Sequence, residues 1–241
     1  SCTEQIVSMA LPALVLANRP EFAKLATGAD PMAGLVDELR LRQTPEGAYR
    51  YWAGGAAVNE DASVWAQALL LEARDAGRPV PQDLVDSGNG YLRQLARRDG
   101  DTLEQERTAA WAIYLLARQG IVVSNEVAAQ QARLVRSHAP RWTTDITAGY
   151  VAAAYELMKQ RELADRTLNP LLKGVRAGDD HWHSGLVADA ELLYLVSRHF
   201  AERLPRLPAN LLPELARRVG GGELHSLSAA TTILALDAYA K

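Results

Sequence analysis

The sequence has little cysteine, few aromatic side chains and no excess of positive charge, and each shortage excludes a class of protein. Cys2 is the one cysteine among 241 residues, so the chain can form neither an internal disulfide nor a cysteine-based zinc site. The net charge is −3, and Lys and Arg are scattered along the chain, which argues against a nucleic-acid partner. Aromatic residues make up 6% of the chain, which argues against the aromatic-lined cavity of a glycosidase.

Long apolar runs are also missing. The longest, residues 6–17, contains Pro12 and falls far short of the about 20 residues that a membrane-spanning helix needs. Because Glu4 precedes it and no Lys or Arg does, it does not look like a signal peptide either. We therefore expect no direct membrane contact from this chain. We expect a single globular domain, residues 1–241, excised from a larger protein whose targeting signals lie elsewhere.

What the sequence does contain is helical periodicity of two kinds. Some segments have a single apolar stripe, as in Leu211, Leu212, Leu215 and Val219. Others are rich in alanine and apolar on nearly all sides, which is typical of buried helices. The segments of this second kind are residues 62–73, 108–117, 148–158, 188–196 and 229–238.

The two kinds of segment alternate, and the alternation is periodic. The buried helices are expected to begin near Asp61, Glu106, Asp145, Gly185 and Leu227, with a period of about 40 residues. With the helix after Cys2, this predicts an all-α fold of about six helical hairpins. An open solenoid and a closed ring both fit such a repeat. Small inner helices that can pack closely favour the ring, an α/α toroid with inner and outer helices.

Local signals refine the expected helix ends. Gly77 and Gly120 stand where helix C-terminal caps belong, and Ser124 and Thr144 where N-caps belong. Alternating aromatics in residues 48–52 predict a short hairpin or an ordered loop. The acidic residues at 104–106 are interpreted as helix N-terminal carboxylates that the helix dipole favours.

The first five residues, Ser1-Cys2-Thr3-Glu4-Gln5, carry the chemical signal. The pattern Cys-x-Glu-Gln resembles the thioester signature of the alpha-2-macroglobulin and complement superfamily. Its place before a series of helix pairs also fits the thioester domain of that superfamily. The chain resembles the bacterial members in particular, because Thr3 stands where the vertebrate motif has glycine. Ser1 departs from the usual preceding glycine, and the aromatic residues that shield the bond in relatives would lie upstream of this chain.

This resemblance implies a covalent trap for proteases, a broad-spectrum endopeptidase inhibitor. The Cys2 thiolate would attack the Gln5 carboxamide, release ammonia and leave an internal thioester, which a lysine of an attacking protease then opens. Each molecule reacts once, so the resemblance implies an inhibitor with no cofactor and not a turnover enzyme. The implied partners are target proteases and other modules of a parent lipoprotein. That parent would act in bacterial defence, in the periplasm and anchored to the inner membrane.

The same residues allow other interpretations. Cys2 could be a buried inert cysteine or a lipidated one, although the apolar segment that follows it is not the polar tether of a lipoprotein. In some complement relatives a histidine before the fourth inner helix accepts the acyl group. His138 lies in the corresponding loop, and it is either such an acceptor or a surface histidine.

Two other classes of function remain open. An α/α-toroid enzyme, of the cyclase, prenyltransferase or glycosidase type, would need an aspartate cluster, a zinc set or facing carboxylates that the sequence does not clearly supply. A helical-repeat module could instead bind partners without covalent chemistry. His181-Trp182-His183 beside Asp179-Asp180 could suggest a metal site, but we expect a capping and packing loop because the two histidines cannot share a helix face.

Overall fold

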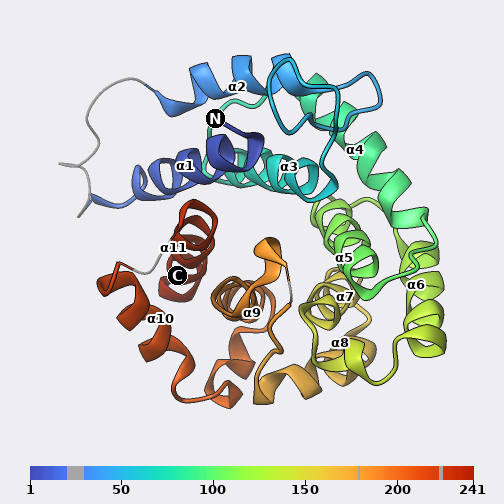
Figure 1. Cartoon of the computed structure of the whole chain (residues 1–241). Coiled ribbons are helices and arrows are strands. Elements are labelled where there is room, and N and C mark those ends of the chain that lie inside the picture. Colours follow the sequence, from blue (N-terminus) through green and yellow to red (C-terminus); the bar gives the residue numbers. More distant parts are fainter. Residues whose placement is uncertain (21–29, 179, 223–224) are drawn as a thin grey trace. The chain divides into compact units, whose positions relative to one another are not determined.

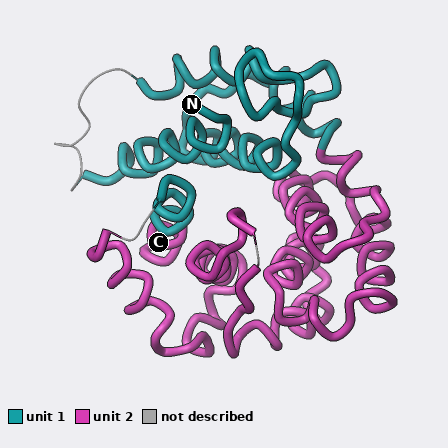
Figure 2. Tube along the Cα trace, in the orientation of Figure 1, with its two compact units in different colours: residues 1–91, 225–234 teal, residues 92–224, 235–241 magenta. Residues whose placement is uncertain are grey.

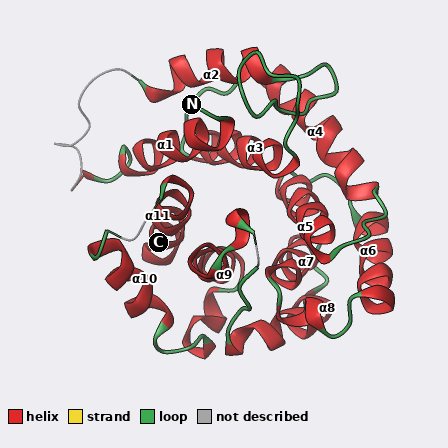
Figure 3. Cartoon of the chain, in the orientation of Figure 1, coloured by secondary structure: helices red, strands yellow, loops and turns green. Residues whose placement is uncertain are grey.

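The computed structural model describes residues 1–20, 30–178, 180–222 and 225–241, which form helices joined by loops (Figure 3). Besides helices, this part of the chain contains two isolated β-bridges, Gln43 with Tyr49 and Arg50 with Val58. The predicted all-α class is confirmed. None of the described helices is long and apolar enough to cross a membrane. The chain divides into two compact units, residues 1–91 with 225–234 and residues 92–224 with 235–241 (Figure 2).

The first unit is built around the N-terminal helix. That helix, α1, packs against both α2 and α3 and buries Val7, Leu11 and Leu14 on its inner side. Helix α3 is buried on nearly all sides, as its alanine-rich sequence predicts. The helices of this unit are α1 (Thr3–Leu16), α2 (Pro31–Arg42), α3 (Glu60–Asp75), the first part of α4 (Gln82–Arg97) and the first part of α11 (Ser226–Ala240).

The second unit is centred on α7, which packs against α5, α8 and α9 (Figure 1). Every residue of α7 from Ile146 to Tyr155 is buried. A Cβ on Gly149 would lie 3.1 Å from a methyl of Leu195, so glycine lets α7 and α9 pack closely here. The unit also contains the last parts of α4 and α11. Its other helices are α5 (Leu103–Arg118), α6 (Ser124–Ser137), η2 (Arg141–Thr144), α7 (Ile146–Leu157), α8 (Arg161–Leu168), η3 (Asn169–Lys173), η4 (His181–His183), α9 (Gly185–His199), η5 (Ala201–Arg206) and α10 (Leu211–Gly220).

The predicted buried helices are all present. They are α3, α5, α7, α9 and α11, which begin at Glu60, Leu103, Ile146, Gly185 and Ser226, close to the predicted starts. Their positions are predictable because a helix that is apolar all round has to be surrounded by other elements.

The predictions for helix ends have a mixed outcome. Gly77 and Gly120 follow the C-caps of α3 and α5 with φ of +80° and +77°, as predicted. Thr144 is not the N-cap of α7: Asp145 takes that place, and its carboxylate accepts from the Thr147 backbone N–H at 2.9 Å. Helix α6 begins after Val123 with no side-chain cap, so the prediction for Ser124 is wrong as well. Residues 48–52 form an ordered loop held by the two β-bridges and not a regular hairpin.

Candidate functional site: a cysteine and a glutamine in one helical turn

Cys2 and Gln5 contact each other reciprocally at the start of α1. Cys2 is the N-cap of the helix, and its Sγ accepts a hydrogen bond from the Gln5 backbone N–H at 3.4 Å. In return, the Cys2 backbone N–H donates to Oε1 of Gln5 at 3.2 Å. This is a capping box in which cysteine takes the place usually held by serine or threonine. It brings the thiol and the carboxamide to the same end of one helical turn.

The two side chains differ in exposure. Cys2 is 4% exposed, and Thr3 and Glu4 beside it are also buried, whereas Gln5 is exposed. The sulfur is therefore covered by protein, while the side chain that carries the carboxamide reaches solvent. A helix N-terminus also supplies backbone N–H groups and a positive dipole end, which stabilise negative charge on a nearby sulfur.

Arg42, near the end of α2, fixes the segment that leads into α1. Its guanidinium is 3% exposed and donates to the Ser1 carbonyl at 3.1 Å and to Oγ1 of Thr3 at 3.3 Å. Glu38 supplies the opposing charge at 3.0 Å from Nη2. The Thr3 backbone N–H donates to the Tyr51 carbonyl at 2.8 Å. The turn that carries Cys2 is thus held on both sides, by α2 and by the loop after it.

The side chain of Tyr51 lies at the cysteine. A hydrogen bond between its hydroxyl and the Cys2 side chain is the main cause that raises the pKa of Tyr51 to about 12, and partial burial adds to the shift. Tyr51 also packs edge-to-face on Trp52, with ring centroids 5.4 Å apart. An aromatic residue within this chain therefore borders the sulfur, in addition to any that would lie upstream.

Glu4, the acid of the motif, belongs to a buried polar network. Its Oε1 accepts from the hydroxyl of Ser8 at 2.6 Å and from that of Ser226, at the start of α11, at 3.1 Å. Trp65 of α3 donates in turn to the Ser8 hydroxyl at 2.9 Å. Glu4 thus joins α1 to α3 and α11, which gives the central residue of the motif a structural role.

His138 lies at the C-cap of α6, where its backbone N–H donates to the Leu134 carbonyl at 2.9 Å. Its ring is half-buried. His138 belongs to the second unit and Cys2 to the first. An acyl-transfer role for His138 therefore stays a prediction.

The loop with His181 and His183 caps a short helix and packs against α9, which is the capping and packing role predicted for it. Asp180 is the N-cap of η4 and accepts from the His183 backbone N–H at 2.9 Å. Trp182 and His183 are buried, and Nδ1 of His183 lies 3.3 Å from Glu191 of α9. Asp179 lies outside the described residues. Within the described ranges, no group of three or more His, Cys, Asp or Glu side chains is placed to hold a metal ion.

Sequence reasoning missed Tyr51 and Arg42 as members of this site. Both are remote from Cys2 in the sequence, and their contacts depend on how α2 and its following loop fold back on α1. The alternating aromatics of residues 48–52 did predict an ordered segment. They did not predict that this segment lies against Cys2.

Fold and site together define a class of protein. It is an all-α domain of helical hairpins, with a cysteine and a glutamine paired one turn apart at the N-terminus of its first helix. No family model matches the chain. An alpha-2-macroglobulin homolog of Yersinia pestis is 32% identical over 98% of the chain, which spans only 12% of that relative.

Solved structures agree in fold. Native alpha-2-macroglobulin from Escherichia coli, spanning domain MG7 to the C-terminus, matches 99% of the chain with a TM-score of 0.80 at 18% identity, and the match covers 39% of that structure. A Salmonella alpha-2-macroglobulin reacted with methylamine matches 98% of the chain with a TM-score of 0.75 at 19% identity, over 16% of its own length. These likenesses are consistent with the predicted all-α toroid. The chain is thus homologous, over nearly its whole length, to one region of the bacterial alpha-2-macroglobulins.

Proposed function

We propose that the chain is the thioester domain of a bacterial alpha-2-macroglobulin and that Cys2 and Gln5 form its internal thioester. The observation that carries the proposal is the reciprocal contact of the two side chains in the first turn of α1. Homology to protease inhibitors favours this function over a cyclase, a glycosidase or another catalytic enzyme.

The bond forms by acyl transfer within the chain. The Cys2 sulfur attacks the side-chain carbonyl carbon of Gln5, the C–N bond of the carboxamide breaks, and ammonia leaves with the thiol proton. The product joins Sγ to the former amide carbon. Because sulfur donates little electron density to the carbonyl, this bond is a stored electrophile.

Capture of a protease reverses the roles of the two residues. A lysine amine attacks the acyl carbon at residue 5, the C–S bond breaks, and the thiolate of Cys2 leaves as an amide forms. The N-terminal end of α1 stabilises the departing thiolate through its dipole, and the Tyr51 hydroxyl is placed to donate a hydrogen bond to it. No step restores the thioester, so each molecule reacts once.

We infer that the partners and the cellular location of the parent protein are those of a bacterial alpha-2-macroglobulin. The partners are target proteases, bound covalently, and the other modules of a parent macroglobulin, of which the chain spans 12–14% of the length in the curated relatives. We place the parent in the periplasm as a lipoprotein of the inner membrane.

Intact mass measurement of the native chain tests the thioester directly. We expect a mass one ammonia below that of the sequence, and incorporation of methylamine at Gln5 with release of an alkylatable Cys2 thiol. Cys2→Ser is the matched control, because serine is a preferred N-cap and preserves the helix start. It should show neither ammonia loss nor methylamine incorporation.

A native chain with the full sequence mass, an alkylatable Cys2 and no methylamine uptake would contradict the proposal. His138 is tested in the same assay with glycerol as a hydroxyl nucleophile. If His138 accepts the acyl group, His138→Gln should lose uptake of glycerol while keeping that of methylamine; equal uptake by the variant and the native chain would leave His138 a surface residue.

A further inference from the structure

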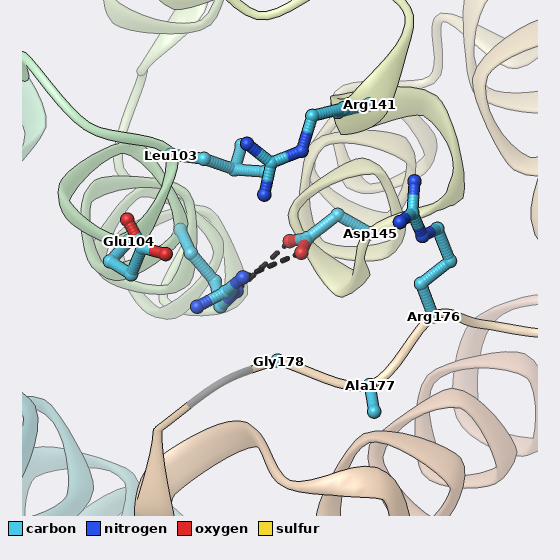
Figure 4. Close-up of a pocket in the computed structure, with 8 residues that line it drawn as sticks. Leu103, Glu104, Arg141, Asp145, Arg176, Ala177 and Gly178 are labelled. Atoms are coloured by element: carbon cyan, nitrogen blue, oxygen red, sulfur yellow. Dashed lines mark hydrogen bonds and ion pairs between the residues drawn. The ribbon is translucent and has the colours of Figure 1, made fainter.

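A small cavity in the second unit is lined by three arginines. Its walls are the first turns of α5, the short helix η2 with the start of α7, and the segment 176–178. The cavity has a volume of about 60 Å³, and Arg107 is one of its lining residues. Figure 4 shows the guanidinium groups of Arg141 and Arg176 at the same cavity. Nothing in the thioester chemistry uses this place.

The floor of the cavity is a satisfied ion cluster. Arg107 is 3% exposed and donates through Nε and Nη2 to the two oxygens of Asp145, at 3.0 and 2.6 Å. Its Nη1 donates to Asp180 at 3.0 Å. Asp145 also accepts from the backbone and the hydroxyl of Thr147. Two carboxylates therefore bind Arg107, so its guanidinium is already engaged in the floor of the cavity.

The rim carries positive charge without such partners. Among the described residues, neither Arg141 nor Arg176 forms an ion pair or a side-chain hydrogen bond. Their guanidinium groups lie on either side of the Asp145 carboxylate in Figure 4. Of the residues that line the cavity, Glu104 is the acid that remains opposite these two cations.

The backbone holds the rim in place. The Arg176 N–H donates to the Thr144 carbonyl at 2.8 Å, which ties segment 176–178 to the end of η2. The Gly178 N–H donates to the His183 carbonyl at 2.7 Å. A Cβ at Gly178 would lie 2.9 Å from that carbonyl oxygen and 3.4 Å from Nη1 of Arg107, so glycine lets the segment close against the ion cluster. The two rim arginines thus extend from anchored backbone.

We propose that this cavity binds a small oxyanion, a phosphate or carboxylate group, between Arg141 and Arg176. A guanidinium presents paired N–H groups that match the spacing of oxygens in such anions. A cavity of about 60 Å³ has room for on the order of four waters, which suits one phosphate or carboxylate group. The anion would offset the repulsion between the two rim cations.

Titration calorimetry with inorganic phosphate, and separately with acetate, tests the site. Sodium chloride at equal ionic strength serves as the reference, and the melting temperature of the chain is recorded in each solution. We expect phosphate or acetate to bind and to raise the melting temperature above that in chloride. Arg141→Gln and Arg176→Gln should each weaken binding by about tenfold, the loss of a charged hydrogen bond, and the double variant should abolish it.

Arg93→Gln is the matched control, because Arg93 is an exposed arginine of α4 in the same unit that does not line the cavity. It should bind as the native chain does. Tighter binding of phosphate would point to a phosphoryl group as the natural ligand, and tighter binding of acetate to an acidic side chain; both support the site. No binding, equal effects of chloride, or equal weakening by Arg93→Gln would overturn it. Circular dichroism without added anion verifies that the exposed-arginine variants are folded.

Discussion

At the scale of the residue, the first turn of α1 shows how one side chain can serve structure and chemistry together. Cys2 completes a capping box, so its sulfur already has the geometry of a hydrogen-bond acceptor toward residue 5. The Tyr51 hydroxyl forms a hydrogen bond with the side chain of the same cysteine. The sequence predicted the cysteine and the glutamine because they are local. It could not predict the tyrosine, which arrives through a loop that closes by tertiary contacts.

Tyr51→Phe should slow the chemistry at Cys2 and leave the fold intact. The variant removes the hydroxyl that hydrogen-bonds the Cys2 side chain. Because a hydroxyl that donates to a thiolate favours it, we expect alkylation of Cys2 by iodoacetamide, measured on chain with a free thiol, to slow by about tenfold. Tyr49→Phe makes the same change at a hydroxyl that instead contacts Gln43 at 3.2 Å, and should react at the native rate. Equal rates for Tyr51→Phe and the native chain would show that the hydroxyl does not act on the sulfur.

At the scale of the element, buried charges determine how the helix starts of the second unit are joined. Arg107 of α5 holds the N-caps of both α7 and η4, Asp145 and Asp180. Glu106, beside it, is fully buried and binds Arg133 of α6 at 2.9 Å. Glu104 and Glu106 do lie in the first turn of α5, as predicted, but that interpretation did not include the ion pair of Glu106 with α6. Helix existence followed from periodicity, but the partner of a charged side chain depends on packing between helices.

Arg107→Met should destabilise the chain strongly, because it removes the guanidinium that donates two hydrogen bonds to the buried Asp145 carboxylate. We expect a loss of about 3–5 kcal/mol in the free energy of unfolding, measured by urea denaturation. Arg97→Met is the comparison: Arg97 pairs with Glu126 at 3.3 Å but is 67% exposed, so its loss should be below about 1 kcal/mol. Similar losses for the two variants would contradict the view that burial makes the Arg107 cluster critical.

At the scale of the whole molecule, the repeat of buried and amphipathic helices was the most predictable feature. The alanine-rich segments gave the positions of α3, α5, α7, α9 and α11, since an all-round apolar helix has few alternatives to burial. Helix caps such as Asp145 were less predictable, because two adjacent polar residues compete for the position and a distant arginine favours one of them.

The stability of the molecule should fall as pH decreases from 6.5 toward 3. Burial, with Arg198 and Arg118 nearby, lowers the pKa of His199 from 6.5 to about 3, so the unfolded chain binds this proton first. The contribution of His199 is complete above pH 6.5 and is lost as pH falls through that window, with a slope of at most ~1.4 kcal/mol per pH unit. Urea denaturation across the window should show a shallower slope in His199→Gln. His181→Gln, at an exposed histidine, should keep the native slope; unchanged slopes in both variants would rule out His199 as the cause.

The hydrogen bond between Glu4 and Ser226 joins residues 222 positions apart, and the first unit is assembled from residues 1–91 and 225–234. A ribosome makes residues 225–234 only after residues 92–224, whereas most of the second unit is one continuous stretch. The second unit can therefore begin to fold while the first still waits for its last helix. Until residue 234 has emerged, the turn that holds Cys2 lacks part of its packing. The environment of the sulfur is therefore complete only after residues 225–234 have been made.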